Sequence, residues 1–202
     1  MRSGAASSAA TSRMEIAAAM ARLYERGINS TMSGNASVRV GRSTMLITPT
    51  SVDKYALGPT EISRFDFGSG RLLSGPKQSE EFRLHAHIYG ASSVGAIVHP
   101  HPQVSVALAD SGKLDPETLA KDEEARAYVG RVGIVGPMPF GSEALAAAVA
   151  AEVGRGRKDV IVIRGHGTVG CGKTVAEALG RVESLEHIAT KMLFKGLISG
   201  RF

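Results

Sequence analysis

Three short runs of apolar residues limit what this 202-residue chain can fold into. Residues 96–99, 132–135 and 160–163 are rich in valine and isoleucine, and each run is too short for a typical helix. Continuous apolar runs of this length are typical of strands that are buried on both faces. An alanine-rich segment at residues 142–153 separates the last two runs and predicts a helix. The pattern therefore indicates a mixed α/β domain with a covered sheet.

The rest of the chain shows strand and helix patterns without an internal repeat or a linker. Ser12 and Glu15 form a capping box, which predicts the start of a first helix that ends at Gly27. Further helices are expected at 79–89, 102–109 and 174–197, and antiparallel hairpins at 36–40 with 45–48 and at 62–67 with 71–73. We therefore expect a flexible N-terminal tail over residues 1–12 and a single domain over residues 13–202.

Composition and charge exclude several classes of protein. The formal net charge is +5, from 24 basic and 19 acidic side chains, but the basic residues are scattered, so we expect no nucleic-acid partner. Cys171 is the only cysteine, which excludes an internal disulfide and the zinc-finger spacings. No apolar run reaches the ~20 residues that a membrane span requires. We expect a cytoplasmic protein with no membrane partner.

The segment Gly167–Thr174 matches the Walker A pattern of nucleotide-binding loops. Gly165, Gly167 and Gly170 also satisfy the dinucleotide-binding glycine pattern. Both folds need further strands downstream, whose acidic residues bind Mg²⁺ or the ribose. Residues 175–202 are all that follow, and nearly all of them predict one helix. We therefore interpret these glycines as a turn from a strand into a helix, and expect neither ATP nor NAD as a ligand.

Histidines lie at the ends of two predicted strands. His99 and His101 are separated by one residue at the end of the 96–99 strand, and an i, i+2 pair on extended backbone points both rings to one side. His166 follows the strand at 160–163 between two glycines, which leave space for its ring. Three neutral imidazoles with an open position suit a catalytic zinc ion, although each histidine could also be a packing or turn residue. The weaker candidates are His85, His87 and His187.

Two carboxylates open the helix predicted at 79–89. Glu80 and Glu81 precede the strand that ends at His99. Acidic side chains in the first turn of a helix usually lie at the surface and interact favourably with the helix dipole. The alternative is an acid or base that acts beside the histidines. These residues alone leave both roles open.

Five short motifs connect the chain to a known family. They follow one another in series: Ser33–Arg39, Leu46–Thr50, Ser79–His85, Val98–His101, and Arg164–Gly167 with Gly172–Ala178. On these motifs the chain resembles the class II sugar-phosphate aldolases, the family of fuculose-phosphate aldolase, ribulose-phosphate 4-epimerase and the adducin head domain. The resemblance implies a three-layer α/β/α fold around a largely antiparallel central sheet, so that residues 13–202 form one class II aldolase-like catalytic domain. It also implies a homotetramer with active sites at subunit interfaces.

The resemblance also assigns roles to the histidines and to one carboxylate. His99, His101 and His166 match the three metal ligands of the family, and Glu81 matches its catalytic acid or base. Zn²⁺ is the expected ion, with Mn²⁺ or Co²⁺ as alternatives. A metal on three neutral imidazoles keeps its full charge and stabilises the enediolate that forms when a carbon–carbon bond of a ketose breaks. Glu81 would carry the proton, for which a pKa raised toward neutrality would help.

A phosphate pocket and a proton donor are further implications of the resemblance. The residues that match the phosphate pocket are Gly34, Asn35, Thr50 and Ser79. Ser51 and Glu80 stand where the fuculose-phosphate enzymes have a glycine and a second serine. If Glu80 points into the pocket it repels a phosphate, and if it faces solvent the pocket remains usable. Tyr128 and Glu124 are the candidates for the proton donor that is a tyrosine elsewhere in the family.

The function that the resemblance implies is aldol cleavage by a metal-dependent carbon–carbon lyase. A ketose 1-phosphate of the fuculose-1-phosphate type would yield dihydroxyacetone phosphate and a short aldehyde through the enediolate. Epimerases, decarboxylases and dehydratases of the same family, acting on a sugar phosphate or a sugar acid, remain alternatives. A non-catalytic scaffold like the adducin head is an alternative from a different class. The expected partners are a small phosphorylated or hydroxy-carbonyl substrate and further copies of the chain.

Overall fold

The structure is a computed structural model that describes the backbone of residues 2–200 and the side chains of residues 9–200. Its elements, in chain order, are α1 (Arg2–Glu25), β1 (Asn35–Arg39), β2 (Thr44–Ile47), η1 (Pro59–Glu61), β3 (Ser63–Asp66), β4 (Arg71–Ser74), α2 (Phe82–Ala91), β5 (Ala96–His99), α3 (Gln103–Asp110), α4 (Pro116–Leu119), η2 (Ala125–Val129), β6 (Val132–Val135), α5 (Glu143–Gly154), β7 (Val160–Ile163), β8 (Gly167–Gly172) and α6 (Val175–Ile198). The strands β5, β6 and β7 have the bounds that the apolar runs predict.

All the strands form one eight-stranded sheet in the order β4-β3-β2-β1-β5-β8-β7-β6. The two predicted hairpins are β1 with β2 and β3 with β4, and both are confirmed as antiparallel pairs. β6 and β7 are parallel because α5 connects them, whereas the other neighbouring strands are antiparallel. The prediction of a largely antiparallel sheet is therefore confirmed.

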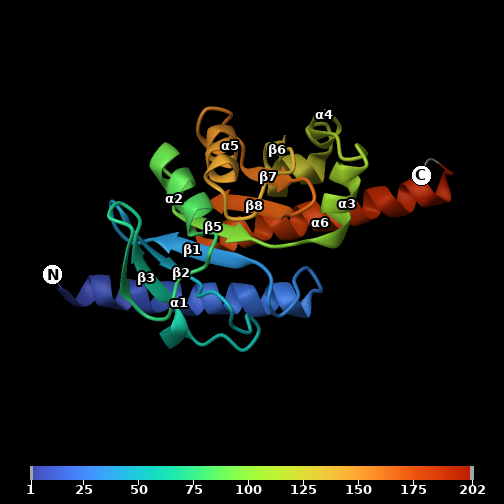
Figure 1. Cartoon of the computed structure of the whole chain (residues 1–202). Coiled ribbons are helices and arrows are strands. Elements are labelled where there is room, and N and C mark those ends of the chain that lie inside the picture. The colour runs from blue at the N-terminus through green and yellow to red at the C-terminus, as the bar shows by residue number, and fades with distance from the viewer. Residues whose placement is uncertain (1, 201–202) are drawn as a thin grey trace.

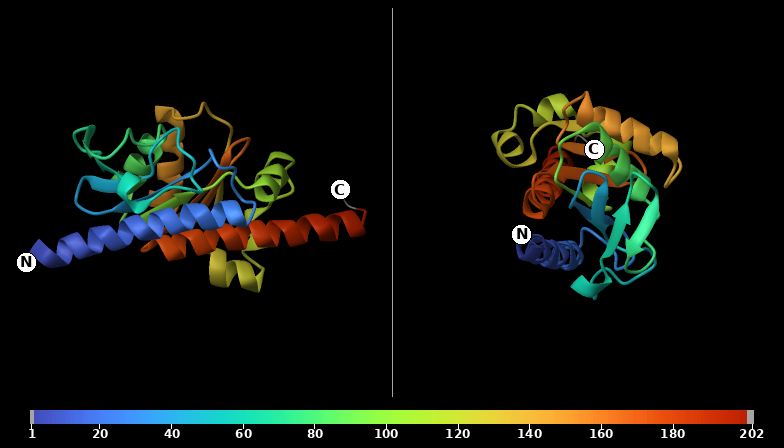
Figure 2. Two further views of the ribbon diagram at one scale, coloured as in Figure 1. Left: turned by 90° about the horizontal axis from the view of Figure 1, so that it is seen from below. Right: turned by 90° about the vertical axis from the view of Figure 1, so that its left-hand side faces the viewer.

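Helices cover both faces of this sheet, as the three-layer prediction requires. α2 and α5 lie on one face, and α1 and α6 lie side by side on the other (Figures 1 and 2). The outer ends of α1 and α6 extend in opposite directions beyond the body of the molecule (Figure 2). Among the described helices, none is long and apolar enough to cross a membrane.

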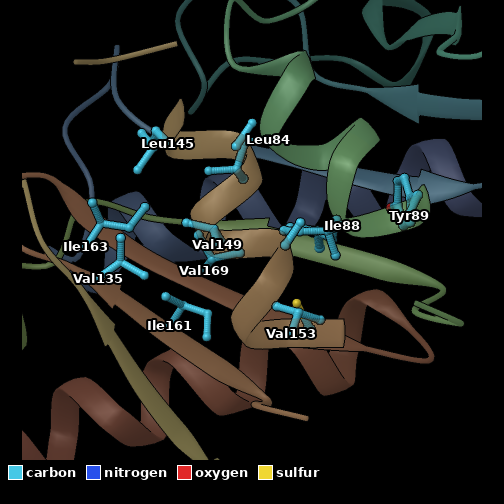
Figure 3. Close-up of a cluster of buried hydrophobic side chains, with 14 of the residues drawn as sticks. Leu84, Ile88, Tyr89, Val135, Leu145, Val149, Val153, Ile161, Ile163 and Val169 are labelled. Atoms are coloured by element: carbon cyan, nitrogen blue, oxygen red, sulfur yellow. The ribbon is translucent and has the colours of Figure 1, made fainter. Parts of the chain in front are cut away.

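β7 shows how the apolar runs produce these layers. Successive side chains of a strand point to opposite faces, so a strand covered on both sides has no polar position. Ile161 and Ile163 join the cluster beneath α2 and α5, in which side chains of both helices point toward the sheet (Figure 3). Val160 and Val162 join the opposite cluster with α3, η2 and α6. Alternate side chains of β7 therefore pack against helices on both faces of the sheet.

The first helix differs from its prediction. α1 begins at Arg2, so Ser12 and Glu15 lie inside the helix instead of at its start. The segment expected as a flexible tail, residues 1–12, is thus helical backbone from Arg2 onward, while residue 1 lies outside the described residues. Alanine has the highest helix propensity, and this segment is rich in it, which explains why the helix continues past the capping-box signature. The mobility of the segment stays a prediction.

The Walker-like segment is a strand and not the predicted turn. Residues 167–172 form β8, which is buried along its whole length and pairs with β5 and β7. A Cβ atom on Gly170 would lie 2.5 Å from the carbonyl oxygen of Ala178 and 2.6 Å from Cγ1 of Val182. The glycine therefore permits the close packing of α6 on the sheet. Because a central strand uses its backbone groups in the ladder, this segment cannot wrap around a phosphate.

Candidate active site

Three histidines meet at one edge of the sheet. His99 is the last residue of β5, His101 follows it after one residue, and His166 lies in the turn from β7 to β8. β5 and β7 both pair antiparallel with β8, so they run in the same direction and end at the same edge. The centroids of the three imidazole rings lie 4.8 to 5.0 Å apart. The two strand ends therefore bring the three rings together.

The inward-facing nitrogens of these rings lack hydrogen-bond partners. Nε2 of His99, of His101 and of His166 is buried, and no described residue forms a hydrogen bond with it. Nδ1 of His99 donates to the carbonyl oxygen of Thr168 over 2.7 Å, which leaves a lone pair on Nε2. Buried polar atoms are normally satisfied, so three such nitrogens in one place indicate a cation site. Imidazole lone pairs are good ligands for a divalent ion such as Zn²⁺.

Glu81 brings a carboxylate to the same histidines. It is the N-cap residue of α2, yet its side chain is buried and makes no capping hydrogen bond. Oε2 lies 3.1 Å from Nε2 of His99, and Oε1 lies 3.3 Å from Nε2 of His166. One atom from Glu81 and one from each histidine lie within 4.8 Å of one another, so the group could hold a metal ion. The surface role considered for Glu81 does not fit this burial.

The charges of this group are coupled. Burial raises the pKa of Glu81, but the nearby histidines, His99 above all, outweigh burial and lower it. This lowering of the pKa is opposite to the rise toward neutrality that would help proton transfer, because imidazoles surround the carboxylate and stabilise its charge. Burial opposes a charge on His99, yet Glu81 raises its pKa overall. Burial lowers the pKa of His101 to about 3 and that of His166 to about 4, with the charge of His99 as the second cause.

Gly167 leaves room for the histidine rings. A Cβ atom at this position would lie 2.6 Å from the carbonyl oxygen of Pro100 and 3.0 Å from ring atoms of His99 and His101. Real Cβ atoms do not approach backbone oxygens so closely, so a side chain at Gly167 would push the rings apart. The glycine after His166 therefore clears space at the site, as predicted, although it does so for the rings of the other two histidines.

A cavity of about 90 Å³ lies beside Glu81 and His101. Every residue predicted to bind or to neighbour a substrate phosphate lines it: Gly34, Asn35, Thr50, Ser51, Ser79 and Glu80. Asn35 differs from the rest because its amide is bonded to Glu81 and to His85. A ligand in this cavity would contact the loop residues at one end and the histidine group at the other.

The sequence is similar to one family of proteins along most of its length. The model of the family described as "Class II Aldolase and Adducin N-terminal domain" matches residues 14–193. The chain belongs to this family. An L-fuculose phosphate aldolase from Methanococcus maripaludis (strain C5) is 33% identical over 83% of this chain and 87% of that protein. A 3-oxo-tetronate 4-phosphate decarboxylase from Haemophilus influenzae is 33% identical over 85% of this chain and 81% of that protein.

Solved structures of the class II aldolase family have the same fold. The crystal structure of L-fuculose-1-phosphate aldolase from Thermus thermophilus matches with a TM-score of 0.81 and 27% sequence identity. The match covers 94% of this chain and 96% of that one. The fold expected from the family resemblance is therefore confirmed across almost the whole chain.

Glu80, where the chain departs from the family pattern, lies at the rim of the cavity. Its side chain is 54% exposed, and Oε1 lies 3.5 Å from Nζ of Lys77. Of the two placements considered for Glu80, the structure has the one that faces solvent. An exposed carboxylate beside an ammonium group is screened by water and by its partner, so it repels a ligand in the cavity only weakly.

Lys54 contributes a cation to the cavity that the motifs did not indicate. Its side chain is buried and lines the cavity, and Nζ donates to the carbonyl oxygen of Val52 over 3.1 Å. Burial lowers the pKa of Lys54. Within the described part of the chain, no carboxylate forms an ion pair with Lys54. The charge of Asp53 offsets the effect of burial only in part, and a buried ammonium group without a direct ion pair favours an anionic ligand.

The candidates for the proton donor are not brought into the cavity. Tyr128 lies on η2 with 65% of its surface exposed, and it is not one of the residues that line the cavity. Glu124 precedes η2 and is paired with Lys191 of α6. The role of Tyr128 as proton donor therefore stays a prediction.

The sequence did not indicate Phe140 at this site, and it placed His85 only among the weaker candidates. Phe140 lines the cavity, and its ring centroid lies 5.8 Å from that of His166. It belongs to the loop between β6 and α5, which has no periodic pattern that could reveal it. His85 is buried against Asn35. Its spacing of four residues from Glu81 places both on one helix face and was the available signal.

Proposed function

We propose that this chain is a divalent-metal-dependent lyase that cleaves a ketose 1-phosphate of the fuculose-1-phosphate type into dihydroxyacetone phosphate and a short aldehyde. The observation that carries the proposal is the convergence of three buried Nε2 atoms without hydrogen bonds, from His99, His101 and His166, on the carboxylate of Glu81. We expect Zn²⁺ as the ion, with Mn²⁺ or Co²⁺ as alternatives, because imidazole nitrogens suit all three.

Glu81 would move the proton in this reaction. A divalent ion held by the histidines would supply positive charge to the carbonyl and neighbouring hydroxyl oxygens of the substrate. Asn35 holds Oε2 of Glu81, while Oε1 has no hydrogen-bond partner among the described residues and can exchange a proton. When the carbon–carbon bond breaks, the hydroxyl group beside it loses a proton and becomes the aldehyde. Glu81, which is ionised because its pKa is lowered, would accept this proton and deliver it to the carbon atom that keeps the bonding electrons.

The cavity beside Glu81 would bind the substrate phosphate. The proposed contacts are Lys54, the hydroxyl groups of Thr50, Ser51 and Ser79, and the backbone at Gly34. Phosphate oxygens accept hydrogen bonds from hydroxyl and ammonium donors, and a charged donor roughly doubles the strength of such a bond. The solvent-facing placement of Glu80 supports a phosphorylated substrate over an unphosphorylated one.

A decarboxylase is the second candidate function. The decarboxylase from Haemophilus influenzae is as similar to this chain as the aldolase from Methanococcus maripaludis, at 33% identity each. Both reactions leave negative charge beside a carbonyl group, which the same ion would stabilise. A scaffold without catalytic activity, like the adducin head, is disfavoured because the histidines and Glu81 keep the geometry of a metal site.

We also propose a homotetramer in the cytoplasm. The end of α6, which extends beyond the body of the molecule, exposes the apolar side chains Phe194, Leu197 and Ile198. Exposed apolar side chains gathered in one place often mark contacts between subunits. Light scattering of the purified protein would test the assembly, since a monomer at micromolar concentration contradicts it.

An assay on protein reconstituted with Zn²⁺, Mn²⁺ or Co²⁺ tests the activity. L-Fuculose 1-phosphate is supplied, and dihydroxyacetone phosphate is detected with a coupled dehydrogenase. A parallel assay measures carbon dioxide released from 3-oxo-tetronate 4-phosphate. We expect metal-dependent formation of dihydroxyacetone phosphate. Turnover of the second compound alone would select the decarboxylase, and full activity in metal-stripped protein would exclude the metal mechanism.

A further inference from the structure

A chain of buried hydrogen bonds leads away from Glu81 into the protein. Nδ2 of Asn35 lies 2.7 Å from Oε2 of Glu81, and Oδ1 of Asn35 lies 2.5 Å from Nε2 of His85. Nδ1 of His85 lies 2.6 Å from the hydroxyl of Ser37, which lies 2.7 Å from the hydroxyl of Tyr89. The five side chains thus form a continuous path that begins at Oε2 of Glu81, which also lies 3.1 Å from Nε2 of His99, and ends at the hydroxyl of Tyr89.

The spacing of a helix and a strand produces this path. Glu81, His85 and Tyr89 are four residues apart, so they lie on one face of α2. Asn35 and Ser37 are two residues apart on β1, so they point to one face of the sheet. Four helical residues rise about 6 Å and two strand residues about 6.6 Å, so the two sets interleave in register.

The chemistry of the groups fixes the direction of every bond in the path. The carboxylate of Glu81 accepts, so Asn35 presents its NH₂ group to it and its carbonyl oxygen to His85. His85 must then carry its proton on Nε2, which leaves Nδ1 to accept from the hydroxyl of Ser37. Ser37 in turn accepts from Tyr89. Every donor therefore points toward Glu81.

Burial makes each of these bonds depend on the next. The exposed fraction is 3% for Asn35, 1% for Tyr89, and 0% for Ser37 and for His85. Burial lowers the pKa of His85 to about 3, with the charge of His99 as a second cause, so the ring is neutral near pH 7. Because water does not replace a lost partner here, removing the donor on His85 frees the amide of Asn35 to rotate.

We infer that His85 is a positioning residue: its Nε2–H holds the amide of Asn35 in the orientation that donates to Glu81. This keeps Oε2 of Glu81, which faces His99, bonded to the amide and leaves Oε1, which has no hydrogen-bond partner among the described residues, beside His166. The inference rests on the proposed function, because it assumes that Glu81 carries the proton. If the amide of Asn35 reversed, its oxygen would face the carboxylate and repel it.

Two variants at one position test the role of His85 in turnover. His85→Leu removes both ring nitrogens, whereas His85→Gln keeps a donor near the position of Nε2 and an acceptor near that of Nδ1. We expect His85→Leu to lower kcat at least about tenfold with KM changed less than about twofold, because positioning of the proton carrier acts on the chemical step. His85→Gln should recover most of kcat. Metal content should be that of the parent in both.

The outcomes separate positioning from a general loss of structure. An unchanged kcat in His85→Leu overturns the inference, as does an equal loss in His85→Gln or a loss that follows the metal content. Tyr89→Phe removes only the far end of the path, so its effect on kcat should be smaller than that of His85→Leu. A larger effect for Tyr89→Phe would contradict the order of the path.

A spectroscopic measurement tests the tautomer without any substrate. Long-range ¹H–¹⁵N correlation of protein labelled at histidine, assigned with His85→Gln, shows which ring nitrogen of His85 carries the proton. We expect a protonated Nε2 and an unprotonated Nδ1 near neutral pH. A proton on Nδ1 would overturn the inference even if the substrate proposed above proves wrong. Conversely, the expected tautomer together with no aldolase or decarboxylase activity would show that the proposed function alone has failed.

Discussion

The histidine group and the anion cavity beside it are built in different ways. His99 ends a central strand, and His166 lies in the turn between two others, so the sheet fixes the positions of both rings. The cavity is formed by loops and by the start of α2, and it contains both departures from the family pattern, Ser51 and Glu80. The difference indicates that the sheet determines the chemistry, whereas the loops determine which substrate it acts on.

The largest effect, on turnover, is expected at Glu81, which belongs to the histidine group and also lines the cavity. Glu81→Gln keeps the shape of the side chain but cannot accept a proton, so turnover should fall by about 10²- to 10⁴-fold. Metal content should be unchanged, because the three histidines remain. Steady-state kinetics and elemental analysis measure the two quantities.

Glu143→Gln is the matched control, because Glu143 is an exposed acidic residue in the first turn of α5. It should lower the free energy of unfolding by at most about 1 kcal/mol and leave turnover unchanged, as a helix-dipole partner does. Equal turnover in the two variants would show that Glu81 acts only as a partner of the helix dipole.

A smaller effect, on KM, is expected at Lys54 in the anion cavity. Lys54→Met removes the buried ammonium group but keeps an unbranched side chain of similar length. KM for a phosphorylated ketose should rise by about 10- to 100-fold, since a hydrogen bond to a charged group contributes about 1.5 to 3 kcal/mol. Lys121→Met, at an exposed lysine that does not line the cavity, is the control and should leave KM unchanged. A KM unaffected in Lys54→Met would place the phosphate elsewhere.

Strand and helix patterns predicted much of the fold because they depend on neighbouring residues. The runs that became β5, β6 and β7 carry their own signal, which is apolar β-branched side chains without polar positions. β8 was missed because glycine has a low strand propensity, and only its pairing with β5 and β7 makes it a strand. Such pairing joins residues that are far apart in the sequence, so no local pattern reveals it.

The site likewise combines residues that a local sequence pattern reveals with residues that only the folded chain brings together. The spacing of His99 and His101 at the end of a predicted strand is a local signal, and it indicates a metal-binding pair from the sequence alone. Lys54 lies outside the matched motif Leu46–Thr50, and only the folded loop places its side chain in the cavity. The direction in which the pKa of Glu81 shifts could not be predicted from the sequence, because it depends on how closely the histidines approach.

A smaller effect on stability is expected at Ser51. Its φ angle is 55°, a left-handed conformation that costs a residue with a Cβ atom about 1 to 2 kcal/mol. Ser51→Gly should raise the free energy of unfolding by about 1 kcal/mol in urea denaturation. Ser51→Ala keeps the Cβ atom and should give no gain. A loss of stability in Ser51→Gly would mean that the hydroxyl group outweighs the backbone strain.

The smallest effect is expected at Glu80. Because the carboxylate faces solvent and is paired with Lys77, Glu80→Ser should change KM for a phosphorylated ketose by less than about threefold. Parallel kinetics on a phosphorylated and an unphosphorylated ketose measure this. A large gain for the phosphorylated compound alone would show that Glu80 turns into the cavity.

Metal content per chain tests the central claim most directly. The protein is dialysed against a buffer with Zn²⁺ and then against metal-free buffer, and bound metal is measured by inductively coupled plasma mass spectrometry. One ion per chain is expected in the parent, and much less in His99→Ala, His101→Ala and His166→Ala. His187→Ala, at an exposed histidine of α6, should keep the parental content. A parent without bound metal, or full occupancy in any of the first three variants, would contradict the account.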